Sequence, residues 1–360
     1  MELTNLEFLK EYTEALGPSC FEKPAQKVME NHIVNNLCMV GDKNELIIDS
    51  IGNLVLDINK KKSKPSKTIG FFTHVDEVSF HVTSITNGGV YVARRSGDVI
   101  SAISSKVAIL NRDLKPIEGL LNYASHSIRN EIDDDYIFVE ILDKNNSAKD
   151  IRGKLKIHEG SPLVYTTNTN IYPNNRIIGK ALDNRVGGYL VTEILRTLRE
   201  SYKSFHDNRY IFANVVQEEI GGNGAAYLAK NYKGLETLDI AFVIDSTHDF
   251  SSFGTTLDNK RQNNSVSIDN GPVITLSPLS NYDIFTKSLS VLESENIKYQ
   301  VRSKTKSSLT DLDRIYVNNF KGFLIQFPTR YMHSSYEMVS QSDIISLCNA
   351  VLNIIEYGNY

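Results

Sequence analysis

Tyr210-Ile211-Phe212-Ala213-Asn214-Val215-Val216 runs directly into Gln217-Glu218-Glu219-Ile220-Gly221-Gly222-Asn223-Gly224. The apolar run predicts a buried β-strand, and the glycine-rich turn after it predicts an entry into a helix. Neighbouring side chains on a strand point to opposite faces, but at a frayed strand end both glutamates can reach one cleft. Such a pair suits a division of labour in which one carboxylate binds a metal and the other moves a proton. Taken alone, the pair is more simply explained as two solvated glutamates.

Other apolar segments lead into polar side chains that suit the same chemistry. They are residues 68–73 before His74, residues 238–244 before Asp245, and residues 322–327 before the segment that contains His333. Asp183 precedes residues 186–198, whose apolar side chains recur with helical spacing. Each has an ordinary alternative, because a lone histidine is more often structural and Asp183 could be an N-cap.

Strands and helices alternate in this part of the chain, which predicts an α/β fold: a mixed sheet flanked by helices on both faces. Residues 45–49 and 54–57 flank a turn and predict a hairpin. Ligands in such sheets collect at the carboxyl ends of the strands. We therefore expect the polar residues that follow the strands to share one rim.

Residues 88–165 have a different character. Short strand-like pieces alternate with turns at residues 90–93, 106–110 and 136–142, and helical periodicity is weak. This pattern predicts an inserted all-β domain of barrel type. The predicted division is a main domain of residues 1–87 and 166–360, which carries the candidate site, and an inserted β-barrel of residues 88–165.

The composition narrows the function further. At 360 residues the chain is long enough for two domains. A net charge of −4 argues against a nucleic-acid-binding surface. The three cysteines lack CxxC spacing, which argues against a disulfide framework or a zinc ribbon. The N-terminus lacks the pattern of a signal peptide and no long apolar run follows, so we expect a cytoplasmic protein with no membrane span.

Two histidines and four carboxylates are thus drawn to one rim by separate strands. They are His74, Asp183, Glu218, Glu219, Asp245 and His333. Such a mixed nitrogen and oxygen set suits zinc or a similar divalent ion, and six groups favour two ions over one.

Provisional roles follow from two-metal hydrolytic chemistry. Asp183 would bridge two ions about 3.5–4 Å apart. His74 and Asp245 would complete one ion, and His333 and Glu219 would complete the other.

The remaining two carboxylates would act in support of the ions. Glu218 would take a proton from the attacking water and pass it to the leaving amine. Asp76 would hydrogen-bond the far nitrogen of His74 and fix its tautomer.

Several stretches together resemble a known family. They are Gly17-Pro18-Ser19-Cys20-Phe21-Glu22, Asp49-Ser50-Ile51-Gly52-Asn53-Leu54, His74-Val75-Asp76-Glu77-Val78, Gly179-Lys180-Ala181-Leu182-Asp183-Asn184-Arg185, Gln217-Glu218-Glu219-Ile220-Gly221 and Pro328-Thr329-Arg330-Tyr331-Met332-His333-Ser334. In this order they are similar to the tetrahedral dinuclear-metal aminopeptidases, the glutamyl and leucyl aminopeptidase family of clan MH, some of whose members carry the name endoglucanase. The resemblance extends over nearly the whole chain.

The resemblance implies a zinc-peptidase fold of the phosphorylase/hydrolase type and an aminopeptidase acting on short peptides. By position it implies the metal ligands and the base named above, with Asp76 as a supporting residue. It also implies two divalent ions, zinc or cobalt, and a homo-oligomer, commonly a dodecamer, in which the inserted domain makes contacts. A deacylase or other amide hydrolase, or a catalytically silent scaffold, is the alternative.

Some positions depart from the family pattern. Cys20 and Ser79 stand where the family usually has glycine, and Gly222-Asn223 stand where it has leucine and arginine. Residues 307–312 only partly match a glycine-glycine-threonine-aspartate-alanine pattern that lines the substrate pocket. The departures concern substrate preference, because the proposed metal and catalytic positions are all intact.

Overall fold

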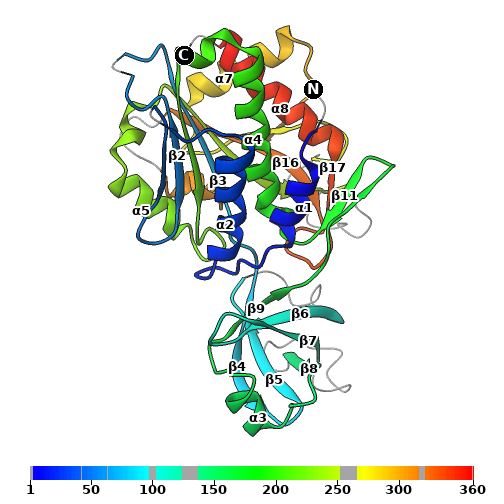
Figure 1. Cartoon of the computed structure of the whole chain (residues 1–360). Helices are drawn as coiled ribbons and strands as arrows, with labels where there is room; N and C mark the ends of the chain where they lie inside the picture. The colour runs from blue at the N-terminus through cyan, green and yellow to red at the C-terminus, as the bar shows by residue number, and fades with distance from the viewer. Residues whose placement is uncertain are drawn as a thin grey trace.

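The computed structural model of the chain describes residues 3–41, 43–62, 64–96, 103–123, 137–251, 266–315, 321–358 and 360. Figure 1 shows a larger body that holds a broad sheet with its helices, and a smaller barrel that projects from it. The first helix, α1 (Leu6–Glu14), and the last, α8 (Gln341–Tyr357), both belong to the larger body. The barrel is therefore an insertion into a chain that leaves the larger body and returns to it.

The described helices and strands follow the chain in a largely alternating order. The other helices are α2 (Lys23–Asn31), η1 (His32–Asn36), α3 (Ala148–Gly153), α4 (Leu182–Ser201), η4 (Lys203–His206), α5 (Asn223–Asn231), η5 (Lys233–Thr237), α7 (Tyr282–Ser294) and η6 (Asp311–Asp313). The strands of the larger body are β1 (Glu45–Ile48), β2 (Leu54–Ile58), β3 (Thr68–His74), β10 (Asn170–Tyr172), β11 (Arg176–Gly179), β12 (Arg209–Val215), β13 (Ile240–His248), β14 (Val273–Leu276), β15 (Gln300–Ser303), β16 (Gly322–Arg330) and β17 (Glu337–Ser340). No helix in the described ranges combines the length and hydropathy needed to cross a bilayer.

The broad sheet is mixed, as the sequence predicted. Its order is β1-β2-β12-β3-β13-β16-β17-β11-β10, with β14 paired to β16 and β15 paired to β14. The central strands β12, β3, β13 and β16 run parallel, whereas β2 and β17 join them in antiparallel pairs. Parallel strands end at the same edge of a sheet, and Val215 at the end of β12 pairs with His74 at the end of β3. The fold class is confirmed.

Apolar side chains cover both faces of this sheet. Every residue of β3 is buried, as expected for a central strand that is covered on both sides. The core on one face includes Leu9, Leu190 and Leu347 of α1, α4 and α8. The core on the other face includes Leu228 and Leu235 of α5 and η5.

β13 and β16 extend further than the apolar segments indicated. The sequence predicted that Asp245 follows a strand end, but β13 continues to His248 and β16 continues to Arg330. The added residues stay in parallel register, with His248 opposite Thr329. Asp245 therefore lies inside a strand, and its backbone is held by the sheet rather than by a loop.

The inserted domain is a closed antiparallel barrel with its own core, which confirms the predicted barrel. Its strands are β4 (Phe80–Thr86), β5 (Gly89–Arg94), β6 (Ser105–Leu110), β7 (Pro116–Tyr123), β8 (Ile137–Ile141) and β9 (Pro162–Tyr165), in the order β4-β5-β8-β7-β6-β9. Val92, Ile109 and Leu163 are among the residues packed inside it. Because β4 begins before residue 88, we propose residues 80–165 as the extent of the inserted domain.

Candidate metal centre

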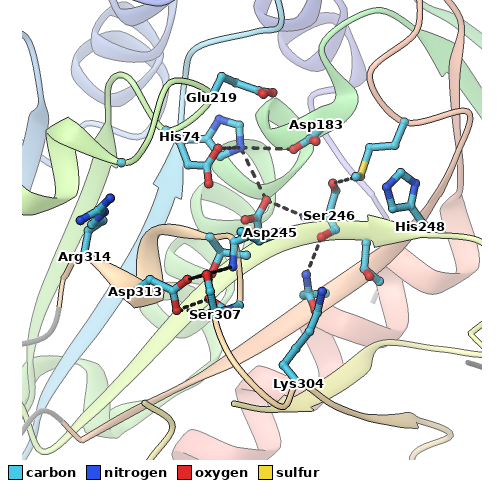
Figure 2. Close-up of a pocket in the computed structure, with 18 of the residues that line it drawn as sticks. His74, Asp183, Glu219, Asp245, Ser246, His248, Lys304, Ser307, Asp313 and Arg314 are labelled. Carbon is cyan, nitrogen blue, oxygen red and sulfur yellow. Dashed lines mark hydrogen bonds and ion pairs between the residues drawn. The ribbon is translucent and has the colours of Figure 1, made fainter. Parts of the chain in front are cut away.

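The structure brings the six predicted side chains together at the carboxyl end of the parallel strands. His74 is the last residue of β3, Glu218 and Glu219 follow β12, and Asp245 lies in β13. Asp183 lies at the start of α4, with non-helical backbone angles, and His333 follows β16. In Figure 2, His74, Asp183, Glu219 and Asp245 point toward one another. Residues from five separate elements thus share one centre.

The glycine-rich turn determines where the glutamate pair lies. Gly221 has a φ of +110°, which a residue with a side chain rarely adopts. A Cβ added at Gly224 would lie 2.1 Å from the carbonyl oxygen of Val216, so this position also requires glycine. The turn allows α5 to begin at Asn223 and leaves Glu218 and Glu219 at the sheet edge.

Asp183 occupies the middle of the centre. Its Oδ1 lies 3.2 Å from Nε2 of His74, and its Oδ2 lies 3.2 Å from Nε2 of His333. Nε2 of His74 also lies 3.5 Å from Oδ1 of Asp245, and Nε2 of His333 lies 3.6 Å from Oε1 of Glu219. Asp183 therefore joins one group that contains His74 and Asp245 to another that contains His333 and Glu219.

These separations fit tetrahedral zinc. Two ligands of a tetrahedral zinc ion with bonds of about 2.1 Å lie about 3.4 Å apart. His74, Asp183 and Asp245 form one set of closely spaced candidate ligands, and Asp183, Glu219 and His333 form another. A third closely spaced set, His74, Glu218 and Glu219, overlaps both of them and does not contain Asp183. Oδ1 of Asp183 and Oε1 of Glu219 are buried and have no hydrogen-bond partner in the described part of the chain. Buried oxygen atoms without partners are costly, and cations at these two positions would satisfy them.

Asp76 holds the backbone of the glutamate pair. Its Oδ1 accepts a hydrogen bond from the N–H of Glu218 at 2.9 Å, and its Oδ2 accepts from the N–H of Glu219 at 3.2 Å. Nδ1 of His74 lies 3.2 Å from the backbone oxygen of Asp76 and 3.5 Å from its Oδ1. The closer partner of the imidazole is thus the Asp76 carbonyl, while the carboxylate mainly fixes the turn.

Glu337 holds the backbone of Asp183 and His333, as Asp76 holds that of the glutamate pair. Glu337 was not identified from the sequence. Its Oε2 accepts from the N–H of Asp183 at 3.0 Å, and its Oε1 accepts from the N–H of His333 at 2.7 Å. The side chain is fully buried, and burial raises its pKa to about 8. The available signal was a carboxylate four residues after His333, at the start of a segment that becomes a buried strand.

The charges of the centre are unbalanced. Burial is the largest influence on Glu219 and raises its pKa to about 8, against the lowering effect of His333. Burial alone would lower the pKa of His333, but the carboxylates of Glu219 and Asp183 outweigh it and raise the value to about 10. Burial alone would also lower the pKa of His74, but the nearby carboxylates of Asp183, Asp245 and Asp76 raise it well above its ordinary value. The cluster contains more carboxylates than cations, which is the electrostatic setting of a cation site.

The centre lines one end of a cavity of about 720 Å³. Glu218 reaches this cavity with 14% of its side chain exposed, and its Oε2 lies 3.9 Å from Nε2 of His74. Residues 306–310 form another part of the wall. Asp311, next to this wall, is buried with its Oδ1 unpartnered among the described residues, and burial raises its pKa to about 8.

Comparisons with known proteins agree with this geometry. Residues 52–349 match the family described as M42 glutamyl aminopeptidase. The lysyl aminopeptidase of Pyrococcus furiosus is 23% identical over 363 aligned residues, which cover 97% of each chain. The TET aminopeptidase of the marine sediment archaeon Thaumarchaeota archaeon SCGC AB-539-E09 has a TM-score of 0.83 at 22% identity, over 98% of this chain and 97% of that one. The TET1 peptidase of Pyrococcus horikoshii has a TM-score of 0.76 at 22% identity, over 98% of this chain and 99% of that one.

The family match spans the inserted barrel and all six residues of the centre. The resemblance that the sequence motifs indicated is thereby confirmed. The chain belongs to the M42 glutamyl aminopeptidase family and is an aminopeptidase.

Proposed function

We propose that the chain is a metal-dependent aminopeptidase that holds two divalent ions and removes N-terminal residues from short peptides. The observation that carries the proposal is that Asp183 presents one carboxylate oxygen to each histidine. His74 and Asp245 would hold one ion with Asp183, and His333 and Glu219 would hold the other. Zinc is the first candidate because the donors are imidazole nitrogens and carboxylate oxygens, and cobalt accepts the same set.

Glu218 is the proposed general base. It is the one member of the glutamate pair that belongs to neither group around Asp183, and it reaches the cavity. From there its carboxylate can take a proton from the attacking water and deliver it to the nitrogen of the leaving amine. The ions, when bound, would polarise the scissile carbonyl and lower the pKa of water. Asp76 and Glu337 would act as positioning residues, because they bind the backbone of Glu218, Glu219, Asp183 and His333.

A chelation experiment tests metal dependence. The purified chain should hydrolyse aminoacyl p-nitroanilides, lose this activity with a chelator and regain it with zinc or cobalt. The same substrates with an acylated α-amine should resist hydrolysis. Cleavage of the acylated substrates would favour a deacylase or other amide hydrolase, and full activity after complete metal removal would contradict the proposal.

Glu218→Gln tests the base. The variant should retain its metal content and lose about 10²–10⁴-fold in kcat, since general acid–base catalysis contributes on that scale. Glu236→Gln is the matched control, because Glu236 is an exposed glutamate outside the cavity. Near-normal turnover by Glu218→Gln would remove this residue from the mechanism.

We further propose a homo-oligomer, and a dodecamer as its size. Support comes from the Pyrococcus horikoshii TET1 peptidase, which can assemble into a tetrahedron or a large octahedral shell. Native mass spectrometry would test the assembly, and a monomeric mass would contradict it. The cytoplasmic location stays a prediction from the sequence.

A further inference from the structure

The inserted barrel contacts the larger body close to the metal centre. It lies directly beyond the carboxyl end of β3, because only residues 75–79 connect β3 to the first barrel strand, β4 (Figure 1). The metal centre lies at that same end of the sheet, where His74 ends β3. The barrel can therefore contact the loops that carry the candidate ligands.

One barrel contact leads to the glutamate pair. Nη1 of Arg95, the residue after β5, donates a hydrogen bond to the backbone carbonyl of Ser19 at 3.1 Å. Oγ of Ser19 in turn donates to Oδ2 of Asp76 at 2.7 Å, and both of these side chains are fully buried. Asp76 accepts from the backbone N–H groups of Glu218 and Glu219. Arg95 is thus connected through Ser19 and Asp76 to the turn that carries Glu219.

A second barrel contact leads to the loop that carries His333. Oγ of Ser105, the first residue of β6, donates a hydrogen bond to Oγ of Ser335 at 2.9 Å. Both serines are buried, so water does not compete freely for this contact. Ser335 lies midway between His333 and Glu337, whose carboxylate accepts from the N–H of His333. A shift of Ser335 would therefore displace both the ligand and the residue that orients it.

The two loops have backbone conformations that need support from their surroundings. Gln217, directly before the glutamate pair, has a φ of +61°, and His333 has a φ of +68°. Residues with side chains rarely adopt such angles, and they keep them only where neighbouring structure holds them. His74 and Asp245 instead lie in β3 and β13, whose backbones are held by sheet pairing. The sheet thus fixes one group of ligands, whereas Glu219 and His333 lie on loops that the barrel supports.

We propose that Arg95 and Ser105 of the inserted barrel are positioning residues for the ion held by Glu219 and His333. The inference rests on the proposed two-ion centre and assigns part of its construction to the inserted domain. Neither residue touches a ligand directly, and each acts through one loop. The ion held by His74 and Asp245 should not depend on the barrel, so the contacts should affect the affinity of one ion and not of the other.

Hydrogen–deuterium exchange of the metal-free chain tests the two contacts without any bound metal. Arg95→Met removes the donor to the Ser19 carbonyl and should speed exchange of residues 217–219 by about two- to tenfold, the factor that corresponds to one ordinary hydrogen bond. Arg95→Lys can still donate and should restore the wild-type rate. Ser105→Ala should speed exchange of residues 333–336 by a similar factor and leave residues 217–219 unchanged. Arg152→Met removes an exposed arginine of the same barrel and should change neither segment.

Competition with a chromophoric chelator measures the consequence for zinc. Residues that orient ligands change affinity by about 10–100-fold, so each barrel variant, acting one contact further away, should weaken one zinc ion by up to about tenfold and leave the other unchanged. Ser105→Ala and Ser335→Ala remove the same contact, so the double variant should lose no more than either single variant. Ser147→Ala is the matched control. Ser147 caps α3, at the end of the barrel far from the larger body in Figure 1, so its loss should weaken the barrel and leave both affinities unchanged.

The outcomes separate this inference from the function on which it rests. Unchanged exchange in both loops, or faster exchange without any loss of zinc affinity, would overturn the inference and leave the two-ion centre intact. Equal weakening of both ions, or an equal effect of Ser147→Ala, would also overturn it, because barrel stability and not the two contacts would then be responsible. A wild-type chain that binds no zinc would contradict the proposed function, and the exchange rates of the metal-free chain would still decide whether the barrel holds the two loops.

Discussion

Two buried charge clusters lie beside the end of β3, and they differ in how their charges are satisfied. In the first, Glu77 accepts hydrogen bonds from Lys180 at 2.8 Å and from Arg185 at 3.0 Å. Arg185 also donates through Nε to the carbonyl of Val75 and through Nη1 to the carbonyl of Tyr12. Charged groups in this cluster have direct protein partners, so it can serve as structure.

The metal centre is the opposite case. It has a surplus of carboxylates, and one buried oxygen each of Asp183 and Glu219 lies near a histidine but has no hydrogen-bond partner among the described residues. Neighbouring residues of one segment belong to different clusters. His74 and Asp76 belong to the metal centre, whereas Glu77 belongs to the ion-pair cluster of Glu77, Lys180 and Arg185. The difference teaches that burial of charge does not identify a functional site, whereas burial of uncompensated charge does.

Breaking the ion-pair cluster should have the largest effect on stability. Arg185→Met leaves Glu77 short of a partner and backbone carbonyls without donors, so we expect a loss of about 3–5 kcal/mol in the free energy of unfolding. Urea unfolding in the presence of a chelator measures it. Arg152→Met is the control, because Arg152 pairs with Glu159 at 2.6 Å on the exposed barrel surface, where solvent screens the pair, and it should cost far less. Equal losses in the two variants would erase the distinction between buried and exposed pairs.

Glu337→Gln should affect the metal centre with little cost elsewhere. A glutamine can accept through only one atom, so one of the backbone N–H groups of Asp183 and His333 loses its acceptor. Residues that orient metal ligands typically change affinity by about 10–100-fold, and we expect a loss of that size for zinc. Competition with a chromophoric chelator measures the affinity. Unchanged affinity would show that Glu337 does not position the ligands.

His32 provides a buried titratable group of a third kind, with no compensating charge in contact. It is 3% exposed, its ring stacks on Phe8 at 3.6 Å, and neither ring nitrogen has a hydrogen-bond partner in the described ranges. Burial lowers its pKa to about 4. Between about pH 6.5 and pH 4 the His32 ring is protonated in the unfolded chain but not in the folded one. The free energy of unfolding therefore falls by about 1.4 kcal/mol for each pH unit across this range, and His32 causes no loss above about pH 6.5.

His32→Phe keeps the stacked ring and removes the titration. The free energy of unfolding of wild type should therefore fall by about 2 kcal/mol more than that of the variant between pH 7 and pH 5. Parallel pH profiles for the two proteins would contradict the assignment.

Asp245→Asn should not lower the free energy of unfolding of the metal-free protein, in contrast to Arg185→Met. Removing one carboxylate relieves like-charge repulsion, so we expect an unchanged or higher free energy of unfolding in chelator, by about 1 kcal/mol, as is common when active-site strain is removed. In zinc the variant should be less stable than wild type, because it loses ligand-linked stabilisation. Thermal unfolding with and without zinc measures both. If Asp245→Asn lowered the free energy of unfolding in chelator as much as Arg185→Met does, Asp245 would be a structural residue and the expectation would be wrong.

The sequence identified most residues of the metal centre but not the residue that positions their backbone. His74, Asp183, Glu218, Glu219 and Asp245 were recognisable because each lies next to an apolar strand or a helix start, and the fold brings strand ends together. Glu337 was not recognisable, because its role depends on backbone groups of residues far away in the sequence. The end of β13 was misplaced at Asp245, since the residues that follow are polar and their pairing with β16 is a long-range property.

Equilibrium dialysis against zinc, followed by elemental analysis, tests the central claim most directly. The wild-type chain should bind two zinc ions per chain. Asp183→Asn should lose both, since Asp183 faces both histidines, whereas His248→Gln should keep two, because His248 lines the cavity but belongs to neither group of ligands. A wild-type chain that binds no zinc, or an Asp183→Asn chain that still binds two, would contradict the account.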